Sequence, residues 1–323
     1  MTDASTPALA AGSVLGVDVG GTKTHLALGT IDGDGQIVRE AIVSTPSWRT
    51  ASVEANAGAI VGLLVDEFGA GAKSVAIGVG AHGCDSTAQC QALEDAIRAL
   101  VTGPVRVLND GELMPWAMGV HGGVGVVVGT GSIAVARDDE GRLITAGGWG
   151  WVLGDEGSSA GIVREATRAV LAELDLGHHD DPLVETLFRS FDVPDGPSLA
   201  MELTRDNSAA RWGRHSRDVF AAADAGSVLA ATVIDDAADS LAGLLDRLHA
   251  RGVSITDVVA GGAVVTAQPR LRDRFVRAVE SAHPGVTVSV LSHPPVVGAL
   301  ALAADLARSQ AHPSHDHVSE AAV

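Results

Sequence analysis

The sequence contains no tyrosine, and Phe, Trp and Tyr together make up only 3% of its 323 residues. Proteins that bind single strands of nucleic acid without sequence preference stack the bases on aromatic rings. Basic residues are also scarce, with 22 Lys and Arg against 40 Asp and Glu, which gives a net charge of -18. Because nucleic acids are bound largely through cations that displace counterions, both shortages argue against a nucleic-acid partner.

Cysteine is nearly absent, and long apolar runs are missing. Cys84 and Cys90 are the only cysteines, too few for a disulfide framework, so reduced thiols in the cytoplasm are expected. Residues 1–15 show no basic segment followed by an apolar one, as a signal peptide would. No apolar stretch reaches the roughly 20 residues that cross a bilayer. We therefore expect a cytoplasmic protein with no membrane partner.

Glycine and apolar residues, by contrast, are abundant. The 39 glycines and 46% hydrophobic residues suit an α/β protein with a large core and many tight turns. A chain of 323 residues is long for one compact domain and sufficient for two.

Apolar runs predict two similar cycles of strands and helices. The first has strands at 13–19, 25–29, 36–44, 74–78 and 104–108, with helices at 51–68 and 89–101. The second has strands at 125–128, 133–137, 143–145, 257–260 and 286–291, helical patterns from 156 to 251, and helices at 269–281 and 296–308. Within the helical region, Asp181-Pro182 predicts a helix start. A glycine turn follows an early strand of each cycle, which indicates two similar halves with a cleft between them.

Two of these glycine turns carry features of a phosphate-binding site. The first consists of Gly20, Gly21, Thr22, Lys23 and Thr24 and follows a strand that contains Asp18; the second consists of Gly129, Thr130, Gly131 and Ser132. Glycines let backbone amides approach an anion, and an acid at the strand end can hold Mg²⁺ through water. The Walker spacing is absent. The first turn alone is equally an ordinary hairpin turn, and the second alone is a weak signal. Together they favour a phosphate site, because a triphosphate with Mg²⁺ requires contacts from two sides.

Asp110 directly follows the strand predicted at 104–108. Ligands of open α/β sheets collect at such strand ends, where a carboxylate can accept a proton from an attacking hydroxyl. An aspartate in this position can equally cap the helix that follows, so the sequence leaves both roles open.

Two further glycine-rich segments complete the pattern. Residues 147–158 place Trp149 and Trp151 among glycines, followed by Asp155 and Glu156. Flat rings suit sugar faces and carboxylates suit sugar hydroxyls; alternatively, the Trp rings pack beneath the loop and one acid caps the next helix. Gly261-Gly262 follows a strand and would let a flat ring such as adenine lie close to the backbone.

In this order the segments resemble the actin, Hsp70 and sugar kinase superfamily, and within it the N-acetylglucosamine and glucosamine kinases of the BadF/BadG/BcrA/BcrD ATPase family. The resemblance covers about residues 14–308 and is most specific from Gly147 to Ser158. It implies two ribonuclease H-like (actin-like ATPase) domains that close over ATP and sugar. The first would comprise residues 1–115, with a helix at 296–308 packing back on it. The second would comprise 116–295 with a helical insertion, and 309–323 would form a flexible tail.

The resemblance also implies a role for each motif. The phosphates of ATP would lie on the turns at 20–24 and 129–132, adenine against Gly261 and Gly262, and Mg²⁺ near Asp18. Asp110 matches the catalytic base of the family. The sugar would contact Asp110 and the set Gly148, Trp149, Asp155 and Glu156, with His82 in the region where relatives contact the C2 substituent.

The reaction expected from the resemblance is phosphoryl transfer from ATP to the 6-hydroxyl of N-acetylglucosamine or a close relative. Relatives often carry an asparagine that contacts the sugar where this chain has Ser44–Arg49, a segment that includes Trp48. Because this chain lacks that amide, glucosamine and N-acetylmuramic acid are alternative acceptors. A homodimer, common among relatives, is compatible with the sequence.

Two other classes are less well supported. An activator ATPase of an acyl-CoA dehydratase needs cysteines that bridge an iron–sulfur cluster, and none follows Gly129–Ser132. A non-catalytic sugar sensor is disfavoured by the retained Asp110 and, for a DNA-binding regulator, by the acidic composition.

Overall fold

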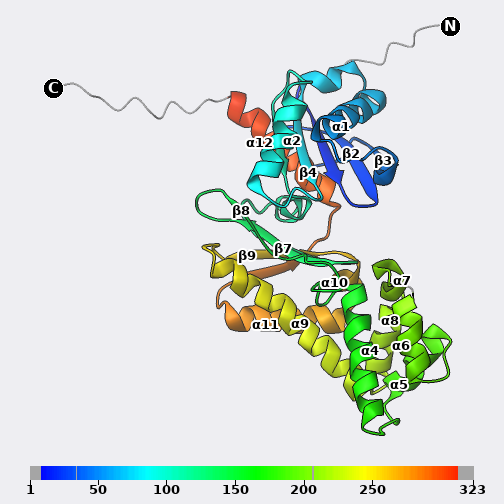
Figure 1. The fold of residues 1–323 in the computed structure, drawn as a ribbon. Helices are drawn as coiled ribbons and strands as arrows, with labels where there is room; N and C mark the ends of the chain where they lie inside the picture. Colours follow the sequence, from blue (N-terminus) through cyan, green and yellow to red (C-terminus); the bar gives the residue numbers. More distant parts are fainter. Residues whose placement is uncertain (1–8, 34, 206, 312–323) are drawn as a thin grey trace. The chain divides into compact units, whose positions relative to one another are not determined.

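The structure is a computed structural model and describes residues 9–33, 35–205 and 207–311 (Figure 1). The chain divides into two compact units, Met1–His121 with Ser292–Val323, and Gly122–Leu291. Each unit combines a five-stranded sheet with helices, so the predicted α/β class is confirmed. The predicted tail at 309–323 lies outside the described residues from 312 onward.

The sheet of the first unit has the strand order β3-β2-β1-β4-β5. Strand β1 pairs antiparallel with β2 and parallel with β4, and β4 pairs parallel with β5. The carboxyl ends of β1, β4 and β5 therefore meet at one edge of the sheet, where ligands of such sheets bind. The strands are β1 Ser13–Val19, β2 Lys23–Thr30, β3 Arg39–Ser44, β4 Ala76–Ala81 and β5 Val105–Leu108.

Helix α12 packs on this sheet although it comes from the far end of the sequence (Figure 1). Its residues Val296 and Leu300 share a buried cluster with Val14 of β1. The approach is close, because a Cβ at Gly78 of β4 would lie 2.2 Å from the carbonyl oxygen of Ala299. The helices of this unit are α1 Val53–Phe68, α2 Thr87–Arg98, α3 Leu113–Ala117 and α12 Pro295–Ala311, with 3-10 turns η1 Thr45–Ser47, η2 Ala70–Ser74 and η3 Asp110–Glu112.

Strand β4 lies later in the sequence than the predicted range 74–78. It spans Ala76–Ala81, and every one of its residues is buried. Glycines at 78 and 80 lower the strand propensity of this segment, but tertiary packing requires them. A Cβ at Gly80 would lie 2.3 Å from Cδ1 of Leu113. Because the strand continues to residue 81, His82 follows it directly.

The sheet of the second unit has the order β10-β9-β6-β7-β8 and repeats the arrangement of the first. Strand β6 pairs antiparallel with β7 and parallel with β9, as β1 does with β2 and β4. The repeated glycine turns therefore predicted the duplication correctly. The strands are β6 Val124–Val128, β7 Ser132–Arg137, β8 Leu143–Gly147, β9 Asp257–Gly261 and β10 Thr287–Val290.

The helices α4 to α9 form the predicted helical region between β8 and β9 (Figure 1). The apolar stripe of α9 is buried at Val233, Leu241, Leu244 and Leu248, which confirms its assignment to the core. The helices are α4 Ser159–Asp175, α5 Pro182–Phe191, α6 Gly196–Arg205, α7 Ala209–Gly213, α8 Ser216–Asp224, α9 Val228–His249, α10 Ala263–Ala267 and α11 Pro269–Ala282. Among the described residues, no helix combines the length and apolar character needed to cross a bilayer.

Candidate active site

Three polar side chains stand at the ends of three neighbouring strands of the first unit. Asp18 is the second-last residue of β1, His82 follows β4, and Asp110 comes two residues after β5. Because these strands are parallel neighbours in the order β1-β4-β5, the three side chains converge on one edge of the sheet. The sequence predicted each residue separately, and the topology brings them together.

His82 and Asp110 form a pair. Nδ1 of His82 lies 3.5 Å from Oδ2 of Asp110, with 57% of the His82 side chain and 27% of the Asp110 side chain exposed. The hydrogen bond that His82 donates to Asp110 raises the pKa of His82, and partial burial opposes this. The carboxylate is thus accessible from solvent while one side of it faces an imidazole.

Asp110 does not cap the helix that follows it. The cap is Asn109, whose side-chain oxygen accepts a hydrogen bond from the amide of Gly111 at 2.9 Å, while Glu112 accepts one from the amide of Asn109 at 2.8 Å. The alternative reading of Asp110 as a cap is therefore wrong. Since Asn109 performs the capping, the carboxylate of Asp110 remains available for chemistry.

Asp18 carries an unfavourable charge in the folded protein. Burial, and secondarily the Asp110 carboxylate, raise the pKa of Asp18 to about 7, while Lys23 lowers it. A divalent cation would relieve the repulsion between the two carboxylates. No group of three or more His, Cys, Asp or Glu that could hold a metal occurs among the described residues. Magnesium is commonly held by one or two carboxylates together with waters and substrate phosphates, so these residues fit Mg²⁺ that arrives with a nucleotide.

The first glycine turn joins β1 to β2 beside Asp18. The amide of Gly20 donates to the carbonyl oxygen of Lys23 at 3.0 Å, and residues 21–23 are exposed. Thr24 differs from its neighbours, because its side chain is buried and its hydroxyl bonds Thr45 Oγ1 at 2.8 Å. The exposed turn is open to an anion, and Thr24 supports it from beneath.

A cavity of about 450 Å³ opens beside His82 in the same unit. Its lining is largely apolar and contains no acid, but it includes Trp48 and Arg49. Arg49 donates to the carbonyl oxygen of His82 at 2.6 Å and pairs with no carboxylate among the described residues. The buried indole Nε1 of Trp48 has no hydrogen-bond partner in the described structure. The cavity therefore combines a largely apolar lining with one cationic side chain.

The second glycine turn, in the other unit, is tied to the loop that follows β8. Gly129, Thr130 and Gly131 are accessible, whereas Ser132 is buried and donates to the carbonyl oxygen of Glu156 at 2.7 Å. At Gly262, where φ is +112°, a Cβ would lie 2.5 Å from the carbonyl oxygen of Val128. Only glycine fits there, so the predicted phosphate turn and the predicted adenine turn lie against each other.

Asp155 is more deeply buried than a simple sugar ligand requires. It is 7% exposed and has a left-handed φ of 55°, which is strained for a residue other than glycine. The amides of Ser132 and Gly150 donate to its carboxylate; burial raises its pKa and these bonds oppose the rise. Asp155 therefore joins the phosphate turn to the loop that contains Gly148 and Trp149.

The remaining predicted sugar residues are distributed around this loop. Trp149 is 75% exposed, so it does not pack beneath the loop, whereas Trp151 lies 4.8 Å from Trp212 between ring centroids. Neither Asp155 nor Glu156 caps α4, because Ser158 accepts the hydrogen bond from the amide of Gly161. The two alternatives for Trp149 and for the acids as helix caps were thus wrong.

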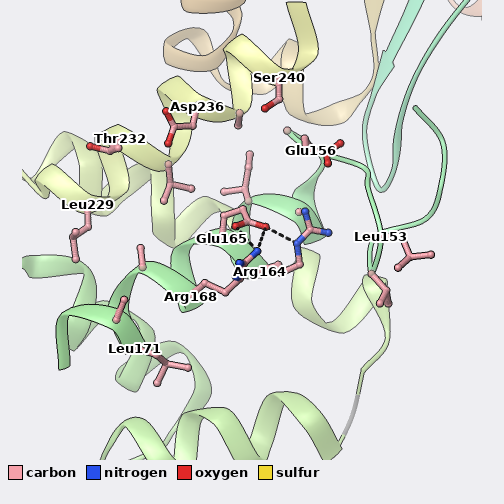
Figure 2. A pocket seen from close by; sticks show the side chains of 18 of the residues that line it. Leu153, Glu156, Arg164, Glu165, Arg168, Leu171, Leu229, Thr232, Asp236 and Ser240 are labelled. Carbon is pink, nitrogen blue, oxygen red and sulfur yellow. Dashed lines mark hydrogen bonds and ion pairs between the residues drawn. The ribbon is translucent and has the colours of Figure 1, made fainter. Parts of the chain in front are cut away.

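A separate cavity of about 960 Å³ lies between the loop, α4 and α9, and its lining includes Glu156. Figure 2 shows Arg164 beside this loop with Glu165 between it and Arg168. Arg164 Nη1 donates to the carbonyl oxygens of Trp151 and, at 2.8 Å, of Gly154. This anchor could not be predicted from the sequence, because arginine at an ordinary helix position is usually a surface residue.

The family model of the BadF/BadG/BcrA/BcrD ATPase family matches residues 15–303. Among curated proteins, the N-acetylmuramic acid/N-acetylglucosamine kinase of Clostridium acetobutylicum is 34% identical over 169 residues, which is 50% of this chain and 54% of that protein. The glucokinase of Streptomyces coelicolor is 33% identical over 124 residues, 35% of this chain and 37% of the glucokinase. The chain thus spans about half or less of the length of these relatives.

Solved structures agree in fold. A Chromobacterium violaceum protein, provisionally assigned as an N-acetylglucosamine kinase, has a TM-score of 0.62 at 22% identity, over 90% of this chain and 98% of that one. A glucokinase of the ROK family from Streptomyces griseus, in complex with glucose and AMPPNP, has a TM-score of 0.52 at 21% identity, over 92% and 100%. At these identities the similarity establishes the fold.

Proposed function

The chain belongs to the BadF/BadG/BcrA/BcrD ATPase family, and on that premise we propose that it is an ATP-dependent sugar kinase. Its acceptor in this proposal is the 6-hydroxyl of an amino sugar, N-acetylglucosamine or a close relative. The observation that carries the proposal is the convergence of Asp18, His82 and Asp110 on one sheet edge, next to the glycine turn that begins at Gly20.

In the proposed reaction, Asp110 orients the sugar hydroxyl and accepts its proton. The hydroxyl oxygen forms a bond to the γ-phosphorus, the bond from that phosphorus to the bridging oxygen breaks, and ADP leaves. Phosphoryl transfer depends mainly on position and charge stabilisation, which we assign to the amides of residues 20–24 and 129–132 and to Lys23. Bound Mg²⁺, held by Asp18 through water, would supply neutralisation of charge on the phosphate oxygens.

The cavity beside His82 supports an acylated acceptor over glucosamine. Its lining contains Arg49 and no acid, so the ammonium group of glucosamine would meet a like charge. An N-acetyl group is uncharged and would place its methyl on the apolar wall, with the Arg49 guanidinium as a donor for its carbonyl.

N-Acetylmuramic acid is the second candidate acceptor. Its lactyl carboxylate matches Arg49, a guanidinium without a carboxylate partner in the described structure, and arginine binds carboxylates well. The Clostridium acetobutylicum relative is named for both sugars, which supports this pair of candidates.

A coupled assay of ADP release over a sugar panel tests the proposal. We expect turnover with N-acetylglucosamine or N-acetylmuramic acid, little with glucosamine, and a loss of about a hundredfold or more in kcat for Asp110→Asn. Asp66→Asn is the matched control, since Asp66 is an exposed aspartate of α1.

The same assay separates the rival classes. Sugar binding without turnover in the unaltered protein would favour a sugar sensor. Turnover that survives in Asp110→Asn at the unaltered rate would remove Asp110 from its proposed role.

A further inference from the structure

A pocket of about 370 Å³ in the second unit borders the glycine turn that begins at Gly129. One wall is formed by Gly129 and Thr130, and another by residues of α10, including Ala263 and Val264. The lining also includes two arginines, Arg214 and Arg217, and it contains no acidic residue. In a chain with 40 acids and 22 basic residues, a pocket with two cations and no anion is an unusual local composition.

The arginines reach this pocket through a chain of close contacts. The amide of Ser159, the first residue of α4, donates to the carbonyl oxygen of Gly129 at 2.9 Å. Gly213, the last residue of α7, lies against Ser159, because a Cβ at Gly213 would be 2.4 Å from Ser159 Oγ. Arg214 follows at once. The helical insertion is therefore fixed against the glycine turn at the point where its arginines begin.

Neither guanidinium has a carboxylate partner among the described residues. Other arginines of the same region do: Arg205 pairs with Glu202 at 2.6 Å and Arg189 with Glu185 at 3.0 Å. Arg214 and Arg217 are both exposed, so their charges remain available to an anionic ligand. Arginine is well suited to such a ligand, because its planar fork donates two parallel hydrogen bonds to phosphate oxygens.

The lining residues from α10 and Gln268 have a different chemistry. Ala263, Val264 and Ala267 present apolar groups, and Gln268 presents an amide. A ligand that matches the whole pocket has a flat, weakly polar part and a phosphorylated part. A nucleotide has both parts.

We infer that Arg214 and Arg217 bind the phosphate chain of the donor nucleotide, so that the helical insertion contributes directly to nucleotide recognition. This inference rests on the proposed function for the presence of a nucleotide at this turn. It adds two cationic residues that lie about 85 positions after the glycine turn in the sequence and that belong to no phosphate-binding motif.

Titration calorimetry with ATP and with adenosine tests the inference. For the variant with both Arg214→Ala and Arg217→Ala, we expect the Kd for ATP to rise about tenfold or more, since hydrogen bonds to charged groups are strong. The Kd for adenosine, which lacks phosphate, should stay within about twofold. The salt dependence of ATP binding should also become weaker, because two cations are removed.

Arg247→Ala is the matched control. Arg247 is an exposed arginine of α9 that lines no part of this pocket, so its substitution removes one of the two positive charges lost in the double variant and should leave ATP binding unchanged. The variant with Arg214→Lys and Arg217→Lys retains charge but loses the planar fork. Its Kd for ATP should lie between those of the unaltered protein and the double alanine variant. Thermal unfolding of each variant establishes that it is folded.

Each result has a distinct meaning. An unchanged ATP Kd in the double alanine variant overturns the inference. An equal loss of ATP and adenosine affinity also overturns it, because the arginines would then contact the nucleoside. Failure of the unaltered protein to bind ATP contradicts the proposed function itself.

Discussion

The Nδ1 atom of His82 lies 3.5 Å from Oδ2 of Asp110. His82 follows β4 and Asp110 follows β5, and these strands are parallel neighbours in the sheet. The pair connects Asp110, the proposed base, to the segment after β4 that lines the cavity beside His82. The hydrogen bond to Asp110 raises the pKa of His82, so the imidazole keeps its positive charge beside the proposed base to a higher pH than usual.

We predict that kcat/KM rises with pH as His82 loses its proton. Below the raised pKa of His82, the imidazolium holds Asp110 in an ion pair that competes with the sugar hydroxyl. His82→Gln removes this titration, so the acid limb of the profile should move to lower pH. Rates measured from about pH 5.5 to 9 check this. An acid limb that coincides in both proteins would contradict the coupling.

Asp18 should destabilise the metal-free protein at neutral and alkaline pH. Its folded pKa of about 7 lies above the ordinary value of 3.8, so its contribution to stability is full below the ordinary value and is lost as pH rises through about 7. Asp18→Asn should therefore unfold at higher urea concentration, with an advantage of up to about 4 kcal/mol at pH 8.

The advantage of Asp18→Asn should shrink as pH falls toward about 5, because the folded wild-type carboxyl is then largely protonated. Urea unfolding in a chelator at both pH values measures it. Asp66→Asn, at an exposed position, serves as the control. A stability difference that does not change with pH would mean that the Asp18 charge has no such effect.

Arg164 should control sugar affinity through the loop that it anchors. It donates to the carbonyl oxygens of Trp151 and Gly154 in the loop that follows β8. Arg164→Ala leaves both carbonyls without this donor, so we expect the KM for sugar to rise about tenfold and that for ATP less than about twofold. Steady-state kinetics with each substrate varied in turn separates the two constants.

Arg168→Ala is the control for this effect. Arg168 contacts the same Glu165 at 3.2 Å but donates to no loop carbonyl in the described structure. Arg164→Lys should restore part of the sugar affinity. A sugar KM that rises equally in the Arg168 and Arg164 variants would assign the effect to Glu165.

Asp181 stabilises two helices with one carboxylate. Its Oδ1 accepts from the amide of Leu183 at 2.9 Å and from Ser227 Oγ at 2.5 Å, and its Oδ2 accepts from the amide of Val228 at 3.0 Å. Asp181→Ala should cost about 1–3 kcal/mol of unfolding free energy, the range of a lost cap with an extra hydrogen bond.

The contribution of Asp181 should also depend on pH. Burial alone would raise its pKa, but hydrogen bonds from Ser227 and the helix amides lower the pKa overall. A lowered folded pKa gives stability that is present above the ordinary value and lost as pH falls through the folded value. The difference between wild type and Asp181→Ala should thus narrow in acid. Equal urea midpoints for wild type and Asp181→Ala at neutral pH would contradict the role of Asp181 in stabilising both helix starts.

Local features could be predicted from the sequence alone. The apolar run that forms β1, the turn at Gly20 and the helix start at Asp181-Pro182 each depend on residues next to one another in the chain. Backbone sterics, burial and capping act over that range, so composition and order were sufficient. The sequence also indicated the duplication of the sheet, because each half repeats the same local signals.

Some choices depended on contacts that sequence spacing does not encode. Whether Asn109 or Asp110 caps η3 depends on backbone angles at a strand end, and Asn109 has the extended ones. Gly80 belongs in β4 because Leu113 leaves no room for a side chain. Arg164 binds carbonyls of a loop 10 and 13 positions earlier in the chain, and Arg214 lines its pocket because the end of α7 packs against the start of α4. Local conformation thus followed from neighbours in the chain, whereas the surroundings of each charge were decided by tertiary packing, because electrostatic and steric contacts depend on distance in space.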